Sequence, residues 1–162
     1  MPARTAPPAS QRRFDSPEQE AFLGLWRTFD RLRALEEDVF ARYGLTPQQY
    51  NALRLLRAAR PETLRTTDLT ERLVSRAPDT TRLLDKLADG KLIERTRPET
   101  NRREVRVGIT PGGVALLDEL QEPLGECHAR QLGHLPRSQL RELIALLRAA
   151  RLPHEDAASS WR

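Results

Sequence analysis

Cysteine and aromatic residues are scarce in this 162-residue chain, and each scarcity excludes a class of protein. Cys127 is the only cysteine, which excludes an internal disulfide and any cysteine-rich zinc module. Aromatic residues make up 5% of the chain, so its core has to consist mainly of Leu, Ala and Val. That composition suits packed helices better than a β-sandwich.

Long apolar runs are also missing. No uninterrupted stretch approaches the ~20 apolar residues that a membrane-spanning helix needs. The first fifteen residues contain no apolar signal core. We therefore expect a soluble, cytoplasmic protein without membrane association.

The sequence shows no pattern of an enzyme or of a metal protein. It has no phosphate-binding glycine loop and no nucleophile–base signature. Its histidines, His128, His134 and His154, are too scattered to suggest a metal site. We expect no catalytic activity, no metal and no cofactor.

The chain does contain an excess of positive charge and clear signals for the starts and ends of helices. The net charge is +4 and the isoelectric point is near 9.9, which permits a polyanionic partner. Capping residues followed by proline start helices at Ser16-Pro17, Thr46-Pro47 and Thr110-Pro111. Pro123 is expected to kink or interrupt the last of these, and a final helix is expected from Pro136 to Ala150.

The middle of the chain has the order of a helix-turn-helix followed by a hairpin. A short helix from Thr66 precedes a longer one over residues 76–89, which Gly90 ends. On the longer helix one face is apolar, and the opposite face is free to enter a DNA major groove. Two alternating segments, Leu92–Arg97 and Arg103–Ile109, then predict an antiparallel hairpin, or wing.

Three motifs at this spacing resemble the MarR family of bacterial transcription regulators, over roughly residues 17–150. They read L-T-P-Q-Q-Y-N-A-L-R-L-L, T-T-R-L-L-D-K-L-A-D-G-K-L-I-E-R and N-R-R-E-V-R-V-G-I-T-P-G-G. The resemblance implies a mainly α fold with a small β-hairpin wing. It also implies a homodimeric repressor that binds pseudo-palindromic operator DNA and often releases it when a small ligand binds.

The same resemblance divides the chain into regions. A single domain is expected over residues 16–151, with the winged helix-turn-helix at about 46–110. Helices at about 17–43 and 111–151 form its dimerisation region. Residues 1–15 are expected to be a disordered arm, and residues 152–162 a frayed tail.

The expected DNA-binding residues lie at the helix-turn-helix and on the wing. They are Thr67, Arg76, Pro78, Thr81, Arg82, Lys86, Arg97, Arg102 and Arg103. The alternative for the helix is a solvated face, on which Arg82 pairs with Asp85 and Lys86 with Asp89. The wing departs from the family pattern, because Asn101 stands where an aspartate usually orients the wing arginine. Asparagine can still hold the turn through its side chain.

Three residues are candidates for binding an aromatic or phenolic effector: Trp26, Tyr50 and Asp79. Each also has a structural interpretation. Trp26 and Tyr50 can belong to the dimer core, and Asp79 can cap the first turn of the 76–89 helix.

Two alternative functions remain. One is a redox-responsive regulator that uses Cys127, although a cysteine on a leucine stripe favours buried packing. The other is a winged helix that binds another protein and has no operator, because acids and bases nearly balance on the 76–89 helix.

Substitution of two arginines separates base contacts from backbone contacts. Arg82→Ala should weaken specific sites more than random DNA, because a bidentate arginine–guanine pair gives ~1–3 kcal/mol of discrimination. Arg103→Ala should weaken both comparably, as loss of a phosphate contact does. Binding titrations on both DNAs measure this, and parental binding by both variants would show that the groove assignments are wrong.

Overall fold

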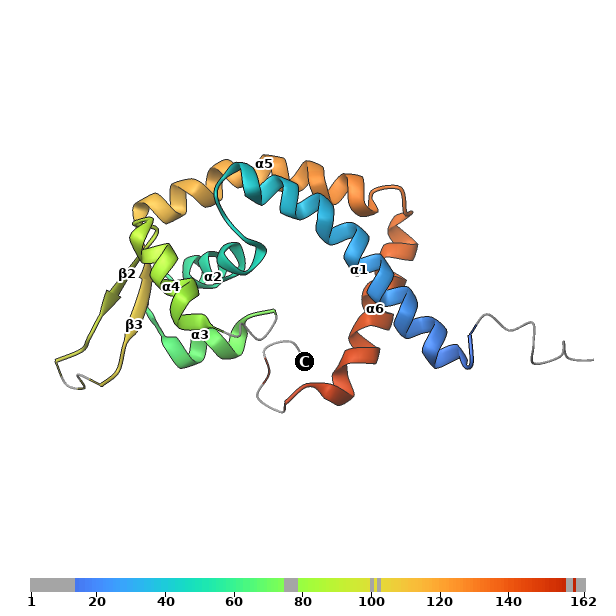
Figure 1. Ribbon diagram of the computed structural model, residues 1–162, viewed down its shortest axis with the longest axis horizontal. Helices are drawn as coiled ribbons and strands as arrows, with labels where there is room; N and C mark the ends of the chain where they lie inside the picture. Colours follow the sequence, from blue (N-terminus) through green and yellow to red (C-terminus); the bar gives the residue numbers. More distant parts are fainter. Residues whose placement is uncertain (1–13, 75–78, 100, 102, 157–158, 160–162) are drawn as a thin grey trace, which may run out of the picture. The chain divides into compact units, whose positions relative to one another are not determined.

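The structure is a computed structural model that describes residues 14–74, 79–99, 101, 103–156 and 159 (Figure 1). Most of the expected N-terminal arm and part of the expected tail therefore lie outside the described residues. The chain divides into two compact units, Met1–Leu35 and Glu36–Arg162. Each unit is described by itself.

The helix α1 (Pro17–Arg42) begins and ends where the sequence predicts. The Gln19 N–H donates to Ser16 Oγ at 3.2 Å, which satisfies one of the free donors of the first turn. Gly44 follows the helix with a φ of 65°, a conformation that glycine adopts without a steric penalty. Within the first unit, large apolar side chains of α1 are exposed: Phe22, Leu23, Leu25, Trp26 and Phe29.

The second unit contains α2 (Pro47–Ala58) and the predicted helix-turn-helix, which consists of α3 (Thr66–Arg72) and α4 (Thr80–Asp89). A capping box holds the start of α2, where Thr46 and Gln49 exchange hydrogen bonds of 2.8 and 3.2 Å. The prediction of a helix over 76–89 was wrong at its start, because α4 begins at Thr80 with Asp79 as its N-cap. Residues 75–78 lie outside the described part of the chain.

A three-stranded antiparallel sheet completes the winged helix. Its order is β1 (Leu64–Arg65), β3 (Arg106–Ile109), β2 (Ile93–Thr96). The two predicted wing strands are present but shorter than expected, and their pairing extends from Ile93↔Ile109 to Thr96↔Arg106. Pro98 lacks an N–H and so cannot extend the ladder. The sequence did not predict β1, because two residues are too few to show an alternating pattern.

Two helices follow the sheet, α5 (Pro111–Leu132) and α6 (Arg137–Arg151), with a short 3-10 helix (Leu152–His154) after them. The helix α5 continues on both sides of Pro123, so the expected interruption does not occur. Pro123 still removes one hydrogen bond from the helix, because it has no N–H to donate.

One apolar core joins the elements of the winged helix to α5. It determines which face of each helix remains exposed, because a buried leucine is removed from water only if its own face turns inward. Its largest fully buried members come from the end of α1 and from α2, α3, α4, β3 and α5: Phe40, Leu53, Leu56, Leu69, Leu84, Leu87, Val107, Leu120 and Cys127.

The turn after α4 is bonded directly to the start of α5. Thr110 Oγ1 donates to the Lys91 carbonyl at 2.7 Å, and the Thr110 N–H donates to the Leu92 carbonyl at 3.1 Å. Thr110 also caps α5, since its hydroxyl accepts from the Gly113 N–H at 3.1 Å. The beginning of α5 is therefore fixed to the segment that ends α4.

Gly113 permits this close approach. A Cβ at this position would collide with the Leu92 carbonyl oxygen and would lie 2.7 Å from Ile109 Cγ1. Gly113→Ala should therefore lower the free energy of unfolding by about 1–3 kcal/mol, as overpacking generally does. Chemical denaturation measures this effect.

Gly125, on the same helix, provides the matched control, because a Cβ at this position would meet no neighbouring atom within 4 Å. The control variant is Gly125→Ala. It should raise the free energy of unfolding by up to about 1 kcal/mol through helix propensity. Equal effects of the two substitutions would contradict the role given to Gly113.

Candidate nucleic-acid interface and ligand pocket

The outer face of α4 has the orientation that the sequence predicts. Leu84 and Leu87 are buried, with exposed fractions of 2% and 0%, whereas Thr81, Arg82 and Lys86 are exposed. Arg82 and Lys86 form no ion pair with the residues that the structure describes.

Two of the acids beside these cations are engaged in the fold. The Arg82 N–H donates to Asp79 Oδ1 at 2.8 Å, so Asp79 caps α4. Asp85 Oδ1 lies 2.7 Å from Nη1 of Arg95, on β2. The pairing of Arg82 with Asp85, considered from the sequence, is replaced by this link from α4 to β2. The exposed face is consequently more positive than its composition indicates.

Asn101 holds the wing turn, as its side chain was expected to do. Its Oδ1 accepts from the Arg103 N–H at 3.3 Å, and its carbonyl accepts from the Glu104 N–H at 3.0 Å. Arg97 and Arg103 are exposed beside this turn. Arg102, the third predicted wing cation, lies outside the described residues.

Arg106 has a structural role at the base of the wing. Its guanidinium donates to the Thr63 hydroxyl at 2.9 Å and to the Thr63 carbonyl at 2.8 Å, and it pairs with Glu104 at 3.0 Å. These bonds use both edges of the guanidinium, so they fix the segment before β1 to β3. The role of Arg106 is therefore internal to the fold.

Thr67 is exposed in the first turn of α3, near a local ion pair. Its hydroxyl lies 3.4 Å from Asp68 Oδ1, and Arg65 Nε lies 3.0 Å from Asp68 Oδ2. The hydrogen bond from Arg65 lowers the pKa of Asp68. The other two predicted contacts of this region, Arg76 and Pro78, lie outside the described residues.

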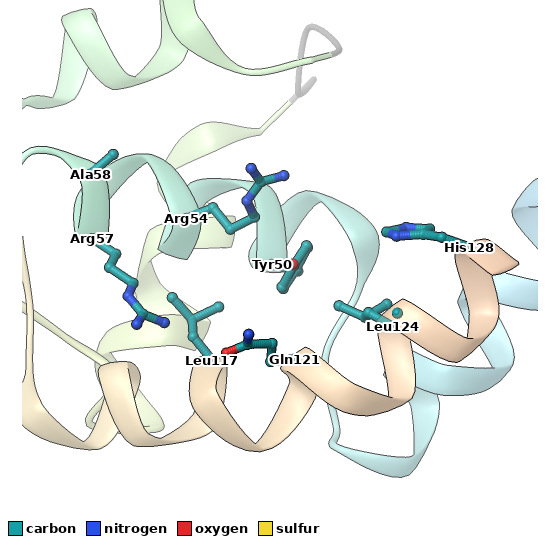
Figure 2. A pocket seen from close by; sticks show the side chains of 9 residues that line it. Tyr50, Arg54, Arg57, Ala58, Leu117, Gln121, Leu124 and His128 are labelled. Atoms are coloured by element: carbon teal, nitrogen blue, oxygen red, sulfur yellow. The ribbon is translucent and has the colours of Figure 1, made fainter. Parts of the chain in front are cut away.

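A pocket of about 700 Å³ lies between α2 and α5 (Figure 2). Figure 2 shows Tyr50 and Arg57 extending from α2 toward the helix that carries Leu117 and Gln121. The lining combines apolar side chains with cations and hydrogen-bonding groups: Tyr50, Arg54, Arg57, Ala58, Leu117, Gln121, Leu124, Gly125 and His128.

The electrostatics of this pocket favour an anionic, planar ligand. The Arg54 guanidinium carbon lies 5.9 Å from the centre of the Tyr50 ring, a cation–π distance. Arg57 is paired with Asp118 across the two helices at 2.8 Å. Burial raises the pKa of Tyr50, an effect that the nearby charge of Arg54 partly opposes, so the phenol is a hydrogen-bond donor at neutral pH.

The sequence identified one of the pocket residues and missed its cations. Of the three effector candidates, Tyr50 lines the pocket, whereas Trp26 and Asp79 are not among the lining residues. Arg54 and Arg57 follow Tyr50 at intervals of four and seven residues, which is the spacing of one helix face. That spacing is the feature of the sequence from which the two pocket cations could have been predicted.

The remaining candidates give no further site. Cys127 is fully buried, which supports a packing role over a redox role. Within the described ranges, no group of His, Cys, Asp and Glu side chains has the arrangement of a metal site. None of the described helices is both long enough and apolar enough to cross a membrane.

A helix-turn-helix with an exposed cationic face, followed by an arginine-bearing hairpin, defines a winged helix-turn-helix protein. The family model described as MarR family matches residues 43–104. No curated protein matches the chain significantly.

Solved structures extend this match to most of the chain. A MarR transcription factor from Planctomyces limnophilus is 52% identical, with a TM-score of 0.67, over 83% of this chain and 98% of the other. A MarR family regulator from Streptomyces coelicolor, solved in complex with DNA, has a TM-score of 0.79 at 15% identity over 93% and 96%. BpsR of Bordetella bronchiseptica, whose DNA binding is regulated by 6-hydroxynicotinic acid, is 22% identical with a TM-score of 0.72. The match covers 81% of this chain and 98% of BpsR. The chain belongs to the MarR family of transcription regulators.

Proposed function

We propose that this transcription regulator is a homodimeric, ligand-responsive repressor that binds a pseudo-palindromic operator. The observation that carries the proposal is the exposed face of α4, where Arg82 and Lys86 are unpaired among the described residues while Asp79 and Asp85 are engaged. Such a face suits a major groove, because the carboxylates of Asp79 and Asp85 are bonded within the fold and are not left free beside the DNA phosphates. A protein with this role acts in the cytoplasm, where the DNA is.

The wing supplies a second contact to the same DNA. Arg97 and Arg103 are exposed on the hairpin that follows α4, and arginines are the residues that enter narrow minor grooves. Asn101 holds the turn that carries Arg103. Thr67, Thr81 and the undescribed Arg76, Pro78 and Arg102 complete the proposed DNA-binding set.

Self-association is supported by the helix α6. Its apolar stripe consists of Leu140, Leu143, Ile144 and Leu147, yet every side chain of this helix is exposed or half-buried. Ile144 is 65% exposed. A second copy of the chain that covers this stripe would remove the apolar surface from water.

Binding to the DNA upstream of its own gene tests the proposal. We expect the purified protein to be a dimer and to shift that DNA in preference to a random duplex of equal length. The logarithm of the affinity should fall with the logarithm of the salt concentration, with a slope of about −0.9 per phosphate contacted. A dimer that shows no salt-sensitive preference for any upstream sequence would contradict the proposal.

The pocket between α2 and α5 is the proposed effector site. Its phenol, guanidinium groups and apolar walls match a ligand that combines an aromatic ring with a carboxylate. Arg54 is the more available cation, because the Arg57 guanidinium is already paired with Asp118. BpsR shows that an aromatic acid can regulate DNA binding in a protein of this fold.

Aromatic acids should raise the unfolding temperature of the protein, because a ligand at 100 times its Kd stabilises the native state by about 2.7 kcal/mol. Thermal unfolding with 6-hydroxynicotinic and benzoic acids, against their neutral amides, measures this. Arg54→Ala should weaken binding of the acids about tenfold or more, as loss of a charged hydrogen bond does.

The matched control for this experiment is Arg130→Ala, which removes an exposed arginine of α5 that does not line the pocket. It should leave the shift with each acid unchanged. Equal stabilisation by acids and amides, or equal responses of the two variants, would contradict an anion site at Arg54.

A further inference from the structure

One ion pair directly links the two elements that the proposed function assigns to DNA. Asp85, in the middle of α4, and Arg95, in the middle of β2, meet at 2.7 Å. Their side chains are 52% and 33% exposed, so the pair lies at the surface and not in the core. A pair this exposed adds little to the stability of the fold.

The position of Asp85 on α4 gives its charge a consequence for DNA binding. It follows Arg82 by three residues, so the two side chains are neighbours on the helix surface, and Arg82, Asp85 and Lys86 are all exposed. An unpaired carboxylate there would repel the phosphates that the cations attract. Arg95 cancels that charge through a short charge-assisted hydrogen bond.

The position of Arg95 gives the pair a geometric consequence. The strand β2 is an edge strand, because the order in the sheet is β1-β3-β2. Its hydrogen bonds to β3 fix the hairpin internally, with Arg95 opposite Val107. Ile93 and Val107 are buried and hold the hairpin against the core that Leu87 shares, and the Asp85–Arg95 bond adds a link between α4 and β2 at the surface.

We propose that Asp85 and Arg95 form a positioning pair for DNA recognition. Arg95 removes the charge of Asp85 from the DNA-facing surface, and Asp85 holds Arg95 away from phosphates while it fixes the wing relative to α4. This inference rests on the proposed DNA-binding function. The two residues therefore have opposite effects on binding to random DNA, although each contributes to the same bond.

The two single variants separate this role from a merely structural one. Arg95→Ala leaves Asp85 unpaired and should weaken binding to random DNA by about tenfold, through one uncancelled charge beside the phosphates. It should weaken binding to operator DNA by more, because the link between the wing and α4 is lost as well. Asp85→Asn frees Arg95 and should strengthen random-DNA binding while it reduces the ratio of operator to random affinity. It should also steepen the salt slope by about 0.9, the value for one added phosphate contact.

The double variant isolates the geometric part. With both charges removed, random-DNA affinity should return close to that of the parent, whereas the operator-to-random ratio should stay reduced because the side-chain link between α4 and β2 is lost. Glu126→Gln and Arg130→Ala, which make the same charge changes on an exposed face of α5, should leave all three readouts unchanged. Arg95→Gln, which removes the charge and keeps a polar side chain of similar reach, replaces Arg95→Ala if that variant does not fold.

Fluorescence anisotropy with operator and random duplexes at several salt concentrations measures every variant beside the parent. If both single variants lost the same factor of affinity for operator DNA as for random DNA, the positioning pair would be overturned. The bond would then have a structural role only. Parental behaviour of both variants would overturn the positioning pair too. A parent that binds neither duplex preferentially would overturn the proposed function and this inference together, so the two failures are distinguishable.

Discussion

The burial of one leucine face of α4 is the constraint on which the candidate interface depends. Leu84 and Leu87 are almost wholly removed from water, and they share their core with side chains from α2, α3, β3 and α5. A helix that buries this face has no freedom to rotate, because exposing either leucine would cost the free energy gained by its burial. The opposite face, with Arg82 and Lys86, is therefore presented to solvent by the core itself.

The surface charges are organised by a few short bonds that follow from this orientation. Asp79 satisfies a donor at the start of α4, and Asp85 is held by Arg95. The Arg106 guanidinium is bonded to Thr63 and Glu104 at the base of the wing. The net charge of +4 is thus a poor guide to the interface, because some arginines hold the fold together and others remain available for DNA.

Hydrogen bonds connect α5, which forms one wall of the pocket, to the end of α4. The pocket lies between α2 and α5, and the first turn of α5 is bonded to Lys91 and Leu92, immediately after α4. At Gly113 the backbone of α5 approaches Leu92 so closely that a Cβ would collide with the Leu92 carbonyl oxygen. The proposed effector site is therefore connected, through the first turn of α5, to the segment that ends α4.

The sequence by itself determined the helices, the wing and the exposed cations of α4, because caps, prolines and apolar periodicity are local signals. It also determined that Asn101 could hold the wing turn. Only the tertiary structure decided that α4 begins at Thr80, that β1 joins the sheet, and that Tyr50 shares a pocket with Arg54 and Arg57. It alone decided that Asp85 pairs with Arg95 instead of Arg82. Partners far apart in sequence leave no local pattern, so their pairing becomes visible only when the core brings their elements together.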